Sequence, residues 1–376
     1  MAHLAQTASP LGGASPSVDW IALMGRRDVP TDGIEDYCTY LAGGLKIRGI
    51  HLGLNRVQWD VQPWRAALRQ LRRESGGWTG KWVLLQYTAL SWSRRGFPFR
   101  VLAVLHILKR IGGRVAVVLH EPSRQARSPR RWIDRLRGAC QDWVIRRLYV
   151  GAEKTIFTVP LETVPWLPAS RSKAAFIPIG PNLPECSLIR ENSDTEPRRI
   201  AVFGLTGHDI AYEVSQIQSV VNQAKERIPR LELTVLGRGS VEARTALEKA
   251  FAANDVKLSI LGILPGEQLA HHLASADALL FVRGSLSLRR GTLLAAMACG
   301  LPIVGYDGPE TDLLIREAGV EAASSGDIDG LAAALTHVLS DDKFRQKLRK
   351  RSKSTYERHF SWDRIAEQFV GVLSND

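Results

Sequence analysis

The sequence predicts two α/β domains in tandem, each built on a doubly wound parallel sheet. Short apolar or β-branched runs alternate with longer amphipathic stretches, and this alternation occurs twice along the 376 residues. Continuous apolar strands between helices are typical of parallel sheets that are covered on both faces. A chain of this length has room for about two domains of roughly 150 residues. Because ligands of such sheets bind beyond the carboxyl ends of the strands, we expect a cleft lined by the loops that follow strands.

The first domain is expected over residues 18–182. Its predicted strands are rich in β-branched and other apolar residues, which favour extended backbone, and lie at 19–25, 49–54, 81–87, 114–120, 153–159 and 174–180. Its predicted helices repeat apolar residues at the helical period and lie near 33–46, 62–75, 98–112 and 129–150. Residues 1–17 have neither a basic start nor an apolar core, so they are expected to be a disordered leader and not a signal peptide.

The second domain is expected over residues 199–360, after a linker at 183–198 that is rich in proline, asparagine and charge. Its predicted strands are 198–204, 231–237, 256–262, 277–282 and 301–306. Its predicted helices lie near 211–227, 241–253, 266–275, 289–299 and 326–340. Residues 361–376 are polar and helical in pattern, and we expect a C-terminal helix there that packs back on the first domain.

The composition is that of a soluble globular protein, with 45% hydrophobic, 23% charged and 7% aromatic residues. No run of about 20 apolar residues is present, so no membrane-spanning helix is expected. The four cysteines, Cys38, Cys140, Cys186 and Cys299, lie far apart without a Cys-x-x-Cys spacing. They are expected to be reduced thiols of a cytoplasmic protein, and neither a disulfide framework nor a zinc site.

The excess positive charge is confined to the first half of the chain. Of a net charge of +12, residues 1–190 contribute 28 basic and 13 acidic side chains, a net +15, and the remainder carries a net −3. Such asymmetry predicts contact with a polyanion, either a membrane surface or nucleic acid. The alternative is an ordinary arginine-rich surface without a partner. We favour an anionic membrane over nucleic acid, because the arginines are not interleaved with a recognised nucleic-acid motif.

Residues 122–151 carry much of this charge on a predicted amphipathic helix. Apolar residues recur there at helical spacing between arginines: Trp132, Leu136, Ala139, Trp143 and Val144. A basic helix with tryptophans can lie on an anionic leaflet. The alternative is that the apolar stripe is core and the arginines are its solvated face. A mixed interpretation turns the stripe inward and the arginines toward the bilayer, with Arg124 and Arg127 of the preceding loop near the headgroups.

The segment DALLFVRGSLSLRRGTLLAAMACGLPIVGYDGPETD, residues 277–312, has the order strand, loop, helix, tight turn and strand. This order resembles the donor-binding half of the family 4 glycosyltransferases, which have the GT-B fold. The resemblance covers residues 198–373, and the first half more loosely through PTDGIEDYCTYLAGGL, VAVVLHEP and AAFIPIGPN. It implies two Rossmann-like domains facing a cleft, a nucleotide-sugar donor as substrate, no cofactor, and retention of anomeric configuration without a metal.

The chain departs from the family at two places. Two glutamates separated by seven residues are usual on this loop and helix, and the corresponding positions here hold Ser287 and Ala295. An arginine and a lysine usually follow the first strand of the second domain, and the loop FGLTGHDIAYE has neither. The usual ribose, sugar and phosphate contacts of the family are therefore not carried over.

Arg289 and Arg290 are predicted to take the place of the absent cations. Ser285 and Ser287 are candidate N-caps of the next helix, which would place both arginines in its first turn. Free amides at a helix N-terminus and two guanidinium groups form a strong anion site, so these arginines are expected to bind the donor diphosphate and act in catalysis. The alternative is a pair of surface arginines matched to acids such as Glu310 or Asp312.

The other donor-binding candidates lie on loops that follow strands. Glycines allow backbone to approach a phosphate closely, although plain strand-to-helix turns remain the alternative. The loop at 261–263 resembles the one whose backbone contacts the nucleotide base, and Glu310 could replace the glutamate lost at Ala295. The full set is Gly204, Thr206, Gly207, His208, Gly237, Leu261, Gly262, Ile263, Ser287 and Glu310.

His120 is the predicted catalytic residue of the first domain. It ends an apolar strand, where its ring can hydrogen-bond a sugar hydroxyl and stabilise developing charge. The acceptor-side candidates are Asp32, Gly33, Glu35, Gln86, Tyr87 and Glu121. The acids near residue 33 could instead serve the N-terminus of the following helix, and the aromatic groups could only pack the loop.

The sequence therefore predicts a glycosyltransferase that moves a sugar from a nucleotide-sugar donor to a glycan or lipid-linked acceptor, in cell-surface polysaccharide or glycolipid synthesis. It is expected to be cytoplasmic and peripheral at the inner face of a membrane. The alternatives are a catalytically inactive binding subunit, motivated by the lost glutamates, and a nucleotide-sugar epimerase of the same fold. Asp327 and Asp329 form the only Asp-x-Asp; they open a predicted helix, so they are expected to cap it, and no metal site is predicted.

Overall fold

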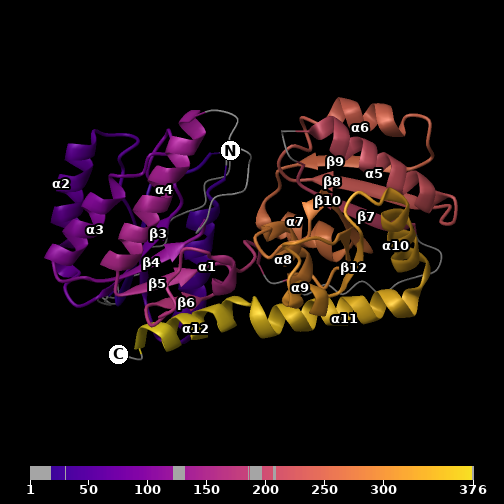
Figure 1. The fold of residues 1–376 in the computed structure, drawn as a ribbon. Helices are drawn as coiled ribbons and strands as arrows, with labels where there is room; N and C mark the ends of the chain where they lie inside the picture. The colour runs from indigo at the N-terminus through magenta and orange to yellow at the C-terminus, as the bar shows by residue number, and fades with distance from the viewer. Residues whose placement is uncertain are drawn as a thin grey trace, which may run out of the picture.

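The computed structural model describes residues 18–29, 31–121, 132–184, 186, 197–205 and 209–374, and the leader expected over 1–17 lies outside them. Two six-stranded parallel sheets, each with flanking helices, form two lobes that lie side by side (Figure 1). The predicted pair of doubly wound α/β domains is confirmed.

The first sheet has the strand order β2-β1-β3-β4-β5-β6, with every pair parallel. Its strands are β1 (Trp20–Met24), β2 (Leu52–Arg56), β3 (Trp82–Tyr87), β4 (Arg114–Leu119), β5 (Lys154–Phe157) and β6 (Ala174–Phe176). Its helices are α1 (Gly33–Ile47), α2 (Trp64–Glu74), α3 (Val101–Arg110) and α4 (Trp132–Gly151), with short 3-10 turns at Ser75–Gly77 and Leu161–Thr163. Strand β6 is shorter than expected, because Pro178 has no N–H to donate to a ladder.

The second sheet has the order β12-β11-β10-β7-β8-β9, again parallel. Its strands are β7 (Arg198–Phe203), β8 (Leu231–Leu236), β9 (Lys257–Gly262), β10 (Ala278–Ser285), β11 (Ile303–Tyr306) and β12 (Val320–Ala323). Its helices are α5 (Ile210–Lys225), α6 (Arg244–Phe251), α7 (Gly266–Ala274), α8 (Gly291–Ala298), α9 (Leu313–Glu317), α10 (Ile328–Ser340) and α11 (Asp342–His359). The short elements β12 and α9 were not predicted, because four or five residues carry too little periodicity.

The last helix, α12 (Trp362–Ser374), belongs to the core of the first domain. Helix α11 runs beneath the second domain, and α12 continues in the same direction under the first (Figure 1). Its buried side chains pack with β1, β3 and α1, and they are Ile365, Ala366, Phe369 and Leu373. A Cβ at Gly44 of α1 would lie 2.6 Å from the carbonyl oxygen of Trp362, so glycine permits the close contact of α1 with α12. The end of the chain thereby joins the two domains.

Arg345 anchors α11 to the second domain. Its side chain is fully buried and donates to the carbonyl oxygens of Val338 and Leu339 at 3.1 and 3.0 Å. It also donates to the carboxylate of Asp342 at 2.6 Å and lies 3.6 Å from that of Asp277. A buried charge is tolerated when it is paired and hydrogen-bonded in this way. The anchor fixes the course of the helix that leads to α12.

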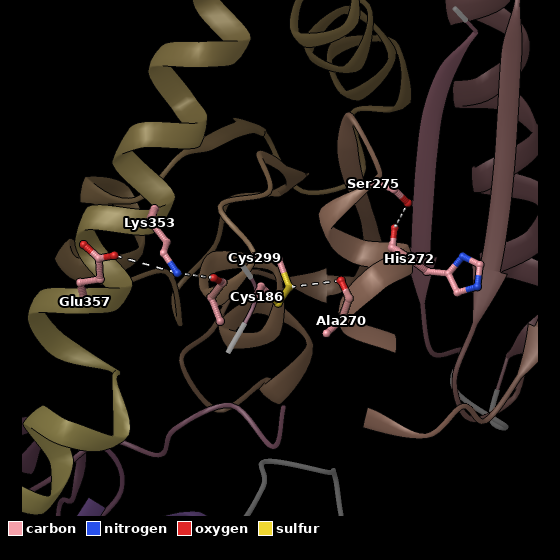
Figure 2. Close-up of a disulfide and its surroundings, with 8 residues drawn as sticks. Cys186, Ala270, His272, Ser275, Cys299, Lys353 and Glu357 are labelled. Atoms are coloured by element: carbon pink, nitrogen blue, oxygen red, sulfur yellow. Dashed lines mark hydrogen bonds and ion pairs between the residues drawn. A yellow bond between two sulfur atoms is a disulfide. The ribbon is translucent and has the colours of Figure 1, made fainter. Parts of the chain in front are cut away.

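Cys186 and Cys299 form a disulfide, so the expectation of four reduced thiols is wrong for this pair (Figure 2). Cys38 and Cys140 are free and buried. The two joined residues are 113 positions apart, and their Cα atoms lie 5.0 Å apart, within the usual range for a disulfide. They meet because the start of the linker lies against the carboxyl end of α8, a tertiary contact that cysteine spacing does not reveal.

Helix α4 turns its tryptophans outward, contrary to the interpretation that the stripe packs inward. Trp132, Leu136 and Trp143 are 75%, 51% and 45% exposed. Of the predicted stripe, only Val144 is buried. The buried face of the helix consists of Gly138, Cys140, Val144, Ile145 and Leu148. Arg124 and Arg127 lie outside the described residues.

Among the helices that the structure describes, none combines the length and hydropathy needed to cross a membrane.

Replacing Phe369 with alanine should lower the free energy of unfolding by about 3–5 kcal/mol, because its fully buried ring leaves a cavity between α12 and the first sheet. Urea unfolding followed by circular dichroism measures this loss. Glu367→Ala on the exposed face of the same helix is the matched control, with an expected change within about 0.5 kcal/mol. Equal stability of the two variants would show that α12 is not part of the core.

Candidate active site

A cavity of about 1040 Å³ lies between the two domains, at the carboxyl ends of their strands. From the first domain it is lined by Gly33, Asp36, Tyr37, Thr88, His120 and Glu121, among others. From the second it is lined by Gly204, Gly237, Arg238, Ile263, Arg283, Arg289, Arg290, Thr292, Ala295 and Glu310, among others. The predicted cleft is therefore present, and nine of the predicted site residues line it: Gly33, His120, Glu121, Gly204, Gly237, Ile263, Arg289, Arg290 and Glu310.

His120 follows β4 and is held by Gln86 of the neighbouring strand β3. Nε2 of the ring lies 2.8 Å from Oε1 of Gln86. An amide oxygen only accepts, so Nε2 carries the proton and donates, and Nδ1 keeps a lone pair. The edge of Tyr37 contacts the ring, with ring centroids 4.9 Å apart. Burial lowers the pKa of His120 to about 4, so the ring is neutral at physiological pH.

Gln86 and Tyr87 were predicted to contact the acceptor, but both lie behind the cavity wall. Gln86 is 1% exposed and Tyr87 is fully buried. Strand residues alternate between the two faces of a sheet, and full burial of β3 leaves neither side chain at the cleft. Gln86 therefore acts on the site only through His120.

Glu121 reaches the cavity beside His120. Burial raises the pKa of its carboxyl group, while a backbone hydrogen bond at Ala89 and the positive charge of Arg289 lower it. The effect of Arg289 comes from the opposite domain. The two walls of the cleft are thus electrostatically coupled at this point.

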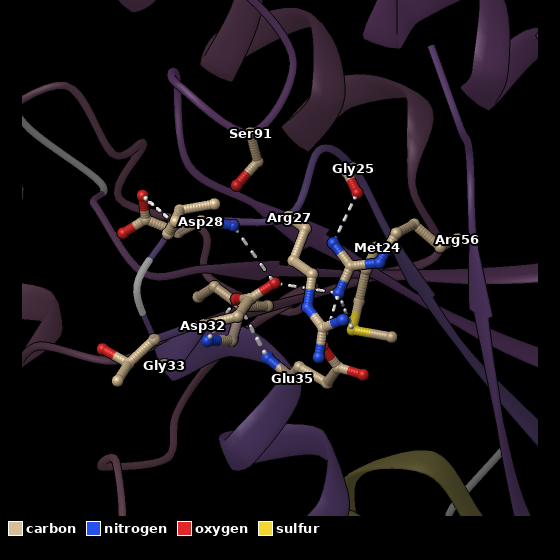
Figure 3. A network of polar contacts seen from close by, with 12 residues as sticks. Met24, Gly25, Arg27, Asp28, Asp32, Gly33, Glu35, Arg56 and Ser91 are labelled. Carbon is tan, nitrogen blue, oxygen red and sulfur yellow. Dashed lines mark hydrogen bonds and ion pairs between the residues drawn. The ribbon is translucent and has the colours of Figure 1, made fainter. Parts of the chain in front are cut away.

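Asp32 and Glu35 do not line the cavity, and Asp32 serves the N-terminus of α1 (Figure 3). Its carboxylate accepts from the backbone N–H groups of Ile34 and Glu35 at 3.1 and 3.2 Å. Arg56 pairs with Asp32 at 2.8 Å and with Glu35 at 3.2 Å. The alternative interpretation of these acids, that they serve the N-terminus of the helix after residue 33, is therefore the one observed. Gly33 lies between them and does line the cleft.

Arg289 and Arg290 line the cavity, but they precede α8 instead of occupying its first turn. The helix begins at Gly291, and Arg290 is its N-cap residue without a side-chain cap. The predicted caps are wrong: Ser285 ends β10, and the hydroxyl of Ser287 accepts from the N–H of Arg289 at 3.3 Å. Ser287 is 2% exposed and does not line the cavity. A tight loop after β10 consumes the residues that the sequence pattern assigned to the helix.

The alternative interpretation of these arginines paired them with nearby acids. Such a pair is present only between Nη1 of Arg289 and Oε1 of Glu310, which lie 3.9 Å apart. Both side chains line the cleft. At that distance the contact is an ion pair without a hydrogen bond. The guanidinium groups therefore remain available to an anion in the cavity.

Two glycines shape the wall that the second domain contributes to the cavity. Gly204 and Gly237 have φ of +76° and +86°, which only glycine adopts readily. A Cβ at Gly237 would lie 2.7 Å from the ring of Phe203. Ile263 lines the cavity but Leu261 and Gly262 do not. Thr206, Gly207 and His208 lie outside the described residues.

Several lining residues were missed by sequence reasoning. Arg283 lies on β10, one position beyond the predicted end of that strand at 282. Arg238 lies between two glycines and reaches across the cleft, donating to the carbonyl oxygen of Thr31 at 2.9 Å and to its hydroxyl at 2.6 Å. Tyr37, Asn182 and Thr292 also line the cavity. If the predicted strand had extended one residue further, Arg283 would have been included among the candidate site residues. No local sequence pattern marks the other missed residues.

Asp327 accepts from the N–H of Gly330 at 2.8 Å and caps α10, which confirms the capping interpretation of the Asp-x-Asp. Within the part of the chain that the structure describes, no group of three or more histidine, cysteine, aspartate or glutamate side chains is arranged to hold a metal ion.

The stability of the protein should fall as pH decreases from 6.5 to 4 through protonation at His120. In this range the unfolded chain binds a proton at His120, whose usual pKa is 6.5, and the folded chain does not. Urea unfolding at several pH values, for wild type and His120→Asn, isolates this contribution. The difference in unfolding free energy between wild type and His120→Asn should narrow toward low pH. A difference that stays constant with pH would contradict a neutral His120 ring in the folded protein.

Comparisons with known proteins agree with this geometry. Residues 201–341 match the family described as "Glycosyl transferases group 1". A GDP-mannose-dependent monoacylated alpha-(1-6)-phosphatidylinositol monomannoside mannosyltransferase of Corynebacterium glutamicum is 24% identical over 157 residues, which are 39% of this chain and 40% of that protein. The match thus spans less than half the length of this curated relative.

Solved structures share the whole fold. Anabaena HepE, solved in complex with UDP and glucose, superposes with a TM-score of 0.63 at 12% identity and covers 96% of this chain and 100% of its own. A glycosyltransferase of Rickettsia africae superposes with a TM-score of 0.65 at 12% identity, covering 95% and 100%. The two domains and their cleft are therefore a GT-B fold, and the second domain carries the match to the glycosyl transferases group 1 family, so the chain is identified as a GT-B protein similar to the family 4 glycosyltransferases.

Proposed function

We propose that the chain transfers a sugar from a nucleotide-sugar donor to a glycan or lipid-linked acceptor, in cell-surface polysaccharide or glycolipid synthesis. The observation that carries this proposal is the cavity of about 1040 Å³ with arginines on the wall of the second domain and His120 on the wall of the first. Its volume is at the upper end of ligand pockets and suits a donor together with the reacting end of an acceptor. The match to a glycosyltransferase family over 201–341 supports the same activity.

In the proposed reaction, the bond between the anomeric carbon and the diphosphate oxygen breaks, and its electron pair stays on that oxygen. The acceptor hydroxyl oxygen bonds the anomeric carbon and releases its proton. Negative charge grows on the diphosphate, next to Arg289, Arg290 and the first amides of α8. Preorganised positive groups at the site of developing charge contribute most to this kind of catalysis.

Two finer features of the reaction remain proposals. We propose that the arginines supply the positive charge that a metal would otherwise provide, so that no divalent cation is required. We also propose retention of the anomeric configuration, which the resemblance to family 4 implies. Chelation of divalent cations and the anomeric form of the product test these two features separately.

His120 is proposed to act as a neutral group. The bond to Gln86 fixes the proton on Nε2 and leaves Nδ1 as an acceptor, so the ring can accept a hydrogen bond from a sugar hydroxyl. Gln86 is the positioning residue that selects this tautomer. Ala295, where the family has a glutamate, offers no polar group on the facing wall.

His120→Ala should lower the turnover of the cognate nucleotide sugar by about 100-fold and change donor affinity less than threefold. Release of nucleoside diphosphate from UDP-, GDP-, ADP- and dTDP-sugars, with and without membrane-derived acceptor, measures turnover; calorimetry measures affinity. Circular dichroism of the variant controls for loss of folding.

Other results would point to the alternatives. Conversion of a nucleotide sugar to its isomer without acceptor would indicate an epimerase. Donor binding without any turnover would indicate an inactive binding subunit, and absence of donor binding would contradict the proposal.

We further propose that the enzyme is peripheral at the inner, cytoplasmic face of a membrane, docked through α4. Trp132, Leu136 and Trp143 are exposed on this helix. Phe99 packs edge-on against Trp143 with centroids 6.0 Å apart, and the guanidinium of Arg147 lies 5.3 Å from the centre of the Trp143 ring. Exposed tryptophans beside arginines suit the interface of an anionic leaflet. The net +15 of residues 1–190 adds long-range attraction.

The protein should pellet with vesicles that contain phosphatidylglycerol and not with neutral ones. Binding should fall as salt is raised, because surface attraction decays within about 10 Å at 0.1 M salt. Trp132→Ala with Trp143→Ala should remove the binding that survives high salt, and Arg146→Gln with Arg147→Gln should weaken the salt-sensitive part. Arg244→Gln with Lys249→Gln on α6 is the matched control. Equal pelleting with neutral and anionic vesicles would contradict the proposal.

A further inference from the structure

Arg283 is a cation that an irregularity in β10 brings into the cleft. The register between β10 and β11 shifts between Phe281 and Ser285, and Gly284 in this bulge has a φ of +75°. Bulges redirect side chains and are frequent beside active sites. Arg283 lies inside this bulge and lines the cavity. The bulge therefore presents a guanidinium group at the point where the second sheet meets the cleft.

The contacts of Arg283 within the protein are neutral. One Nη donates to the hydroxyl of Thr292 at 3.1 Å, and the guanidinium lies 5.5 Å from the centre of the Phe281 ring. Its Nε is buried and has no hydrogen-bond partner. Among the described residues, no carboxylate forms an ion pair with it. Burial and the neighbouring Arg290 lower its pKa, against a smaller opposing effect of Glu213.

Arg283 and Arg345 are both arginines of the second domain, half-buried and fully buried respectively, and they differ in their partners. Arg345 is matched by Asp277 and Asp342 and by two carbonyl oxygens. A buried cation without such partners costs stability, because its hydration is lost and no countercharge replaces it. Among the described residues, Arg283 has no ion-pair partner, and only the smaller effect of Glu213 opposes its positive charge.

The surroundings of Arg283 are shaped for an anion. Arg290 and Arg289 line the same cavity, and α8 begins immediately after them. Gly204, at the end of β7, has a φ of +76°, and a Cβ there would lie 3.3 Å from an Nη of Arg283. Glycine at this position leaves a phosphate room to reach both the backbone and the guanidinium.

We propose that Arg283 binds the diphosphate of the donor, supplying from β10 the positive charge that the loop after β7 lacks. This inference rests on the proposed function and deepens it. Arg283 contacts the phosphates from the side of the sheet, while Arg289 and Arg290 contact them from the start of α8. The same contact stabilises the nucleoside diphosphate as it leaves, because negative charge then accumulates on it.

Arg283→Met tests this assignment, since methionine keeps an unbranched side chain and removes the charge. We expect a 10- to 100-fold loss of affinity for the nucleoside diphosphate that wild type binds best among UDP, GDP, ADP and dTDP, and less than a threefold change for the matching nucleoside. Arg283→Lys should recover part of the affinity. Inorganic pyrophosphate, as a probe without a base, should lose affinity in parallel. Isothermal titration calorimetry at fixed salt measures all of these.

Thermal unfolding without ligand distinguishes binding from a structural role. Arg283→Met should keep or raise the unfolding temperature, because it removes a half-buried charge that forms no ion pair with a carboxylate of the described residues. Arg345→Met is the matched control and should lower it, because it breaks a paired buried cation. A lower unfolding temperature for Arg283→Met, together with equal losses for nucleoside and nucleoside diphosphate, would show that Arg283 is structural.

The outcomes also separate this inference from the proposed function. If wild type and Arg283→Met bind the nucleoside diphosphate equally well, the assignment of Arg283 is wrong and the proposed function stands. If wild type binds none of the four nucleoside diphosphates, the proposed function is wrong and the assignment fails with it.

Discussion

The guanidinium groups of Arg283, Arg289 and Arg290 share one wall of the cleft, and carboxylates of the described residues match them only through the 3.9 Å contact of Arg289 with Glu310. Like charges held together at a partly buried surface repel one another, so the surrounding scaffold must hold them in place. The bulge in β10, the loop after it and the start of α8 do so. An anion in the cavity would offset the repulsion, which is why we propose that a diphosphate binds at this wall.

The opposite wall must be held at a fixed distance for such a site to act on a sugar. Helix α12 contributes to this, because it follows α11, which runs beneath the second domain, and is buried in the core of the first. Arg345 anchors the preceding helix, and the glycine at residue 44 admits α12 close to α1. Near the mouth of the cleft, Arg238 donates to Thr31 of the other domain. The neutral His120, fixed by Gln86, therefore faces the arginines across a cavity with defined walls.

The sequence predicted the two sheets and the positions of His120, Arg289 and Arg290 at the cleft, because apolar periodicity locates strands and their carboxyl ends locate the site. It did not reveal Arg283, because a bulge extends β10 beyond its apolar run. Asp32 and Gln86 were assigned to the acceptor, but one caps a helix and the other lies behind His120. Local patterns predict which residues end a strand. Which side chain then faces the cavity, or meets a distant cysteine, depends on tertiary packing.

The central claim is that the arginine wall binds the diphosphate of a nucleotide-linked sugar. Thermal unfolding with a panel of UDP-, GDP-, ADP- and dTDP-sugars, each beside its nucleoside, tests it most directly. One member of the panel should stabilise the protein by about 2.7 kcal/mol at 100 times its dissociation constant, and its nucleoside should stabilise it far less. Indifference of the unfolding temperature to every nucleotide sugar, or equal effects of nucleoside and nucleotide sugar, would contradict the account.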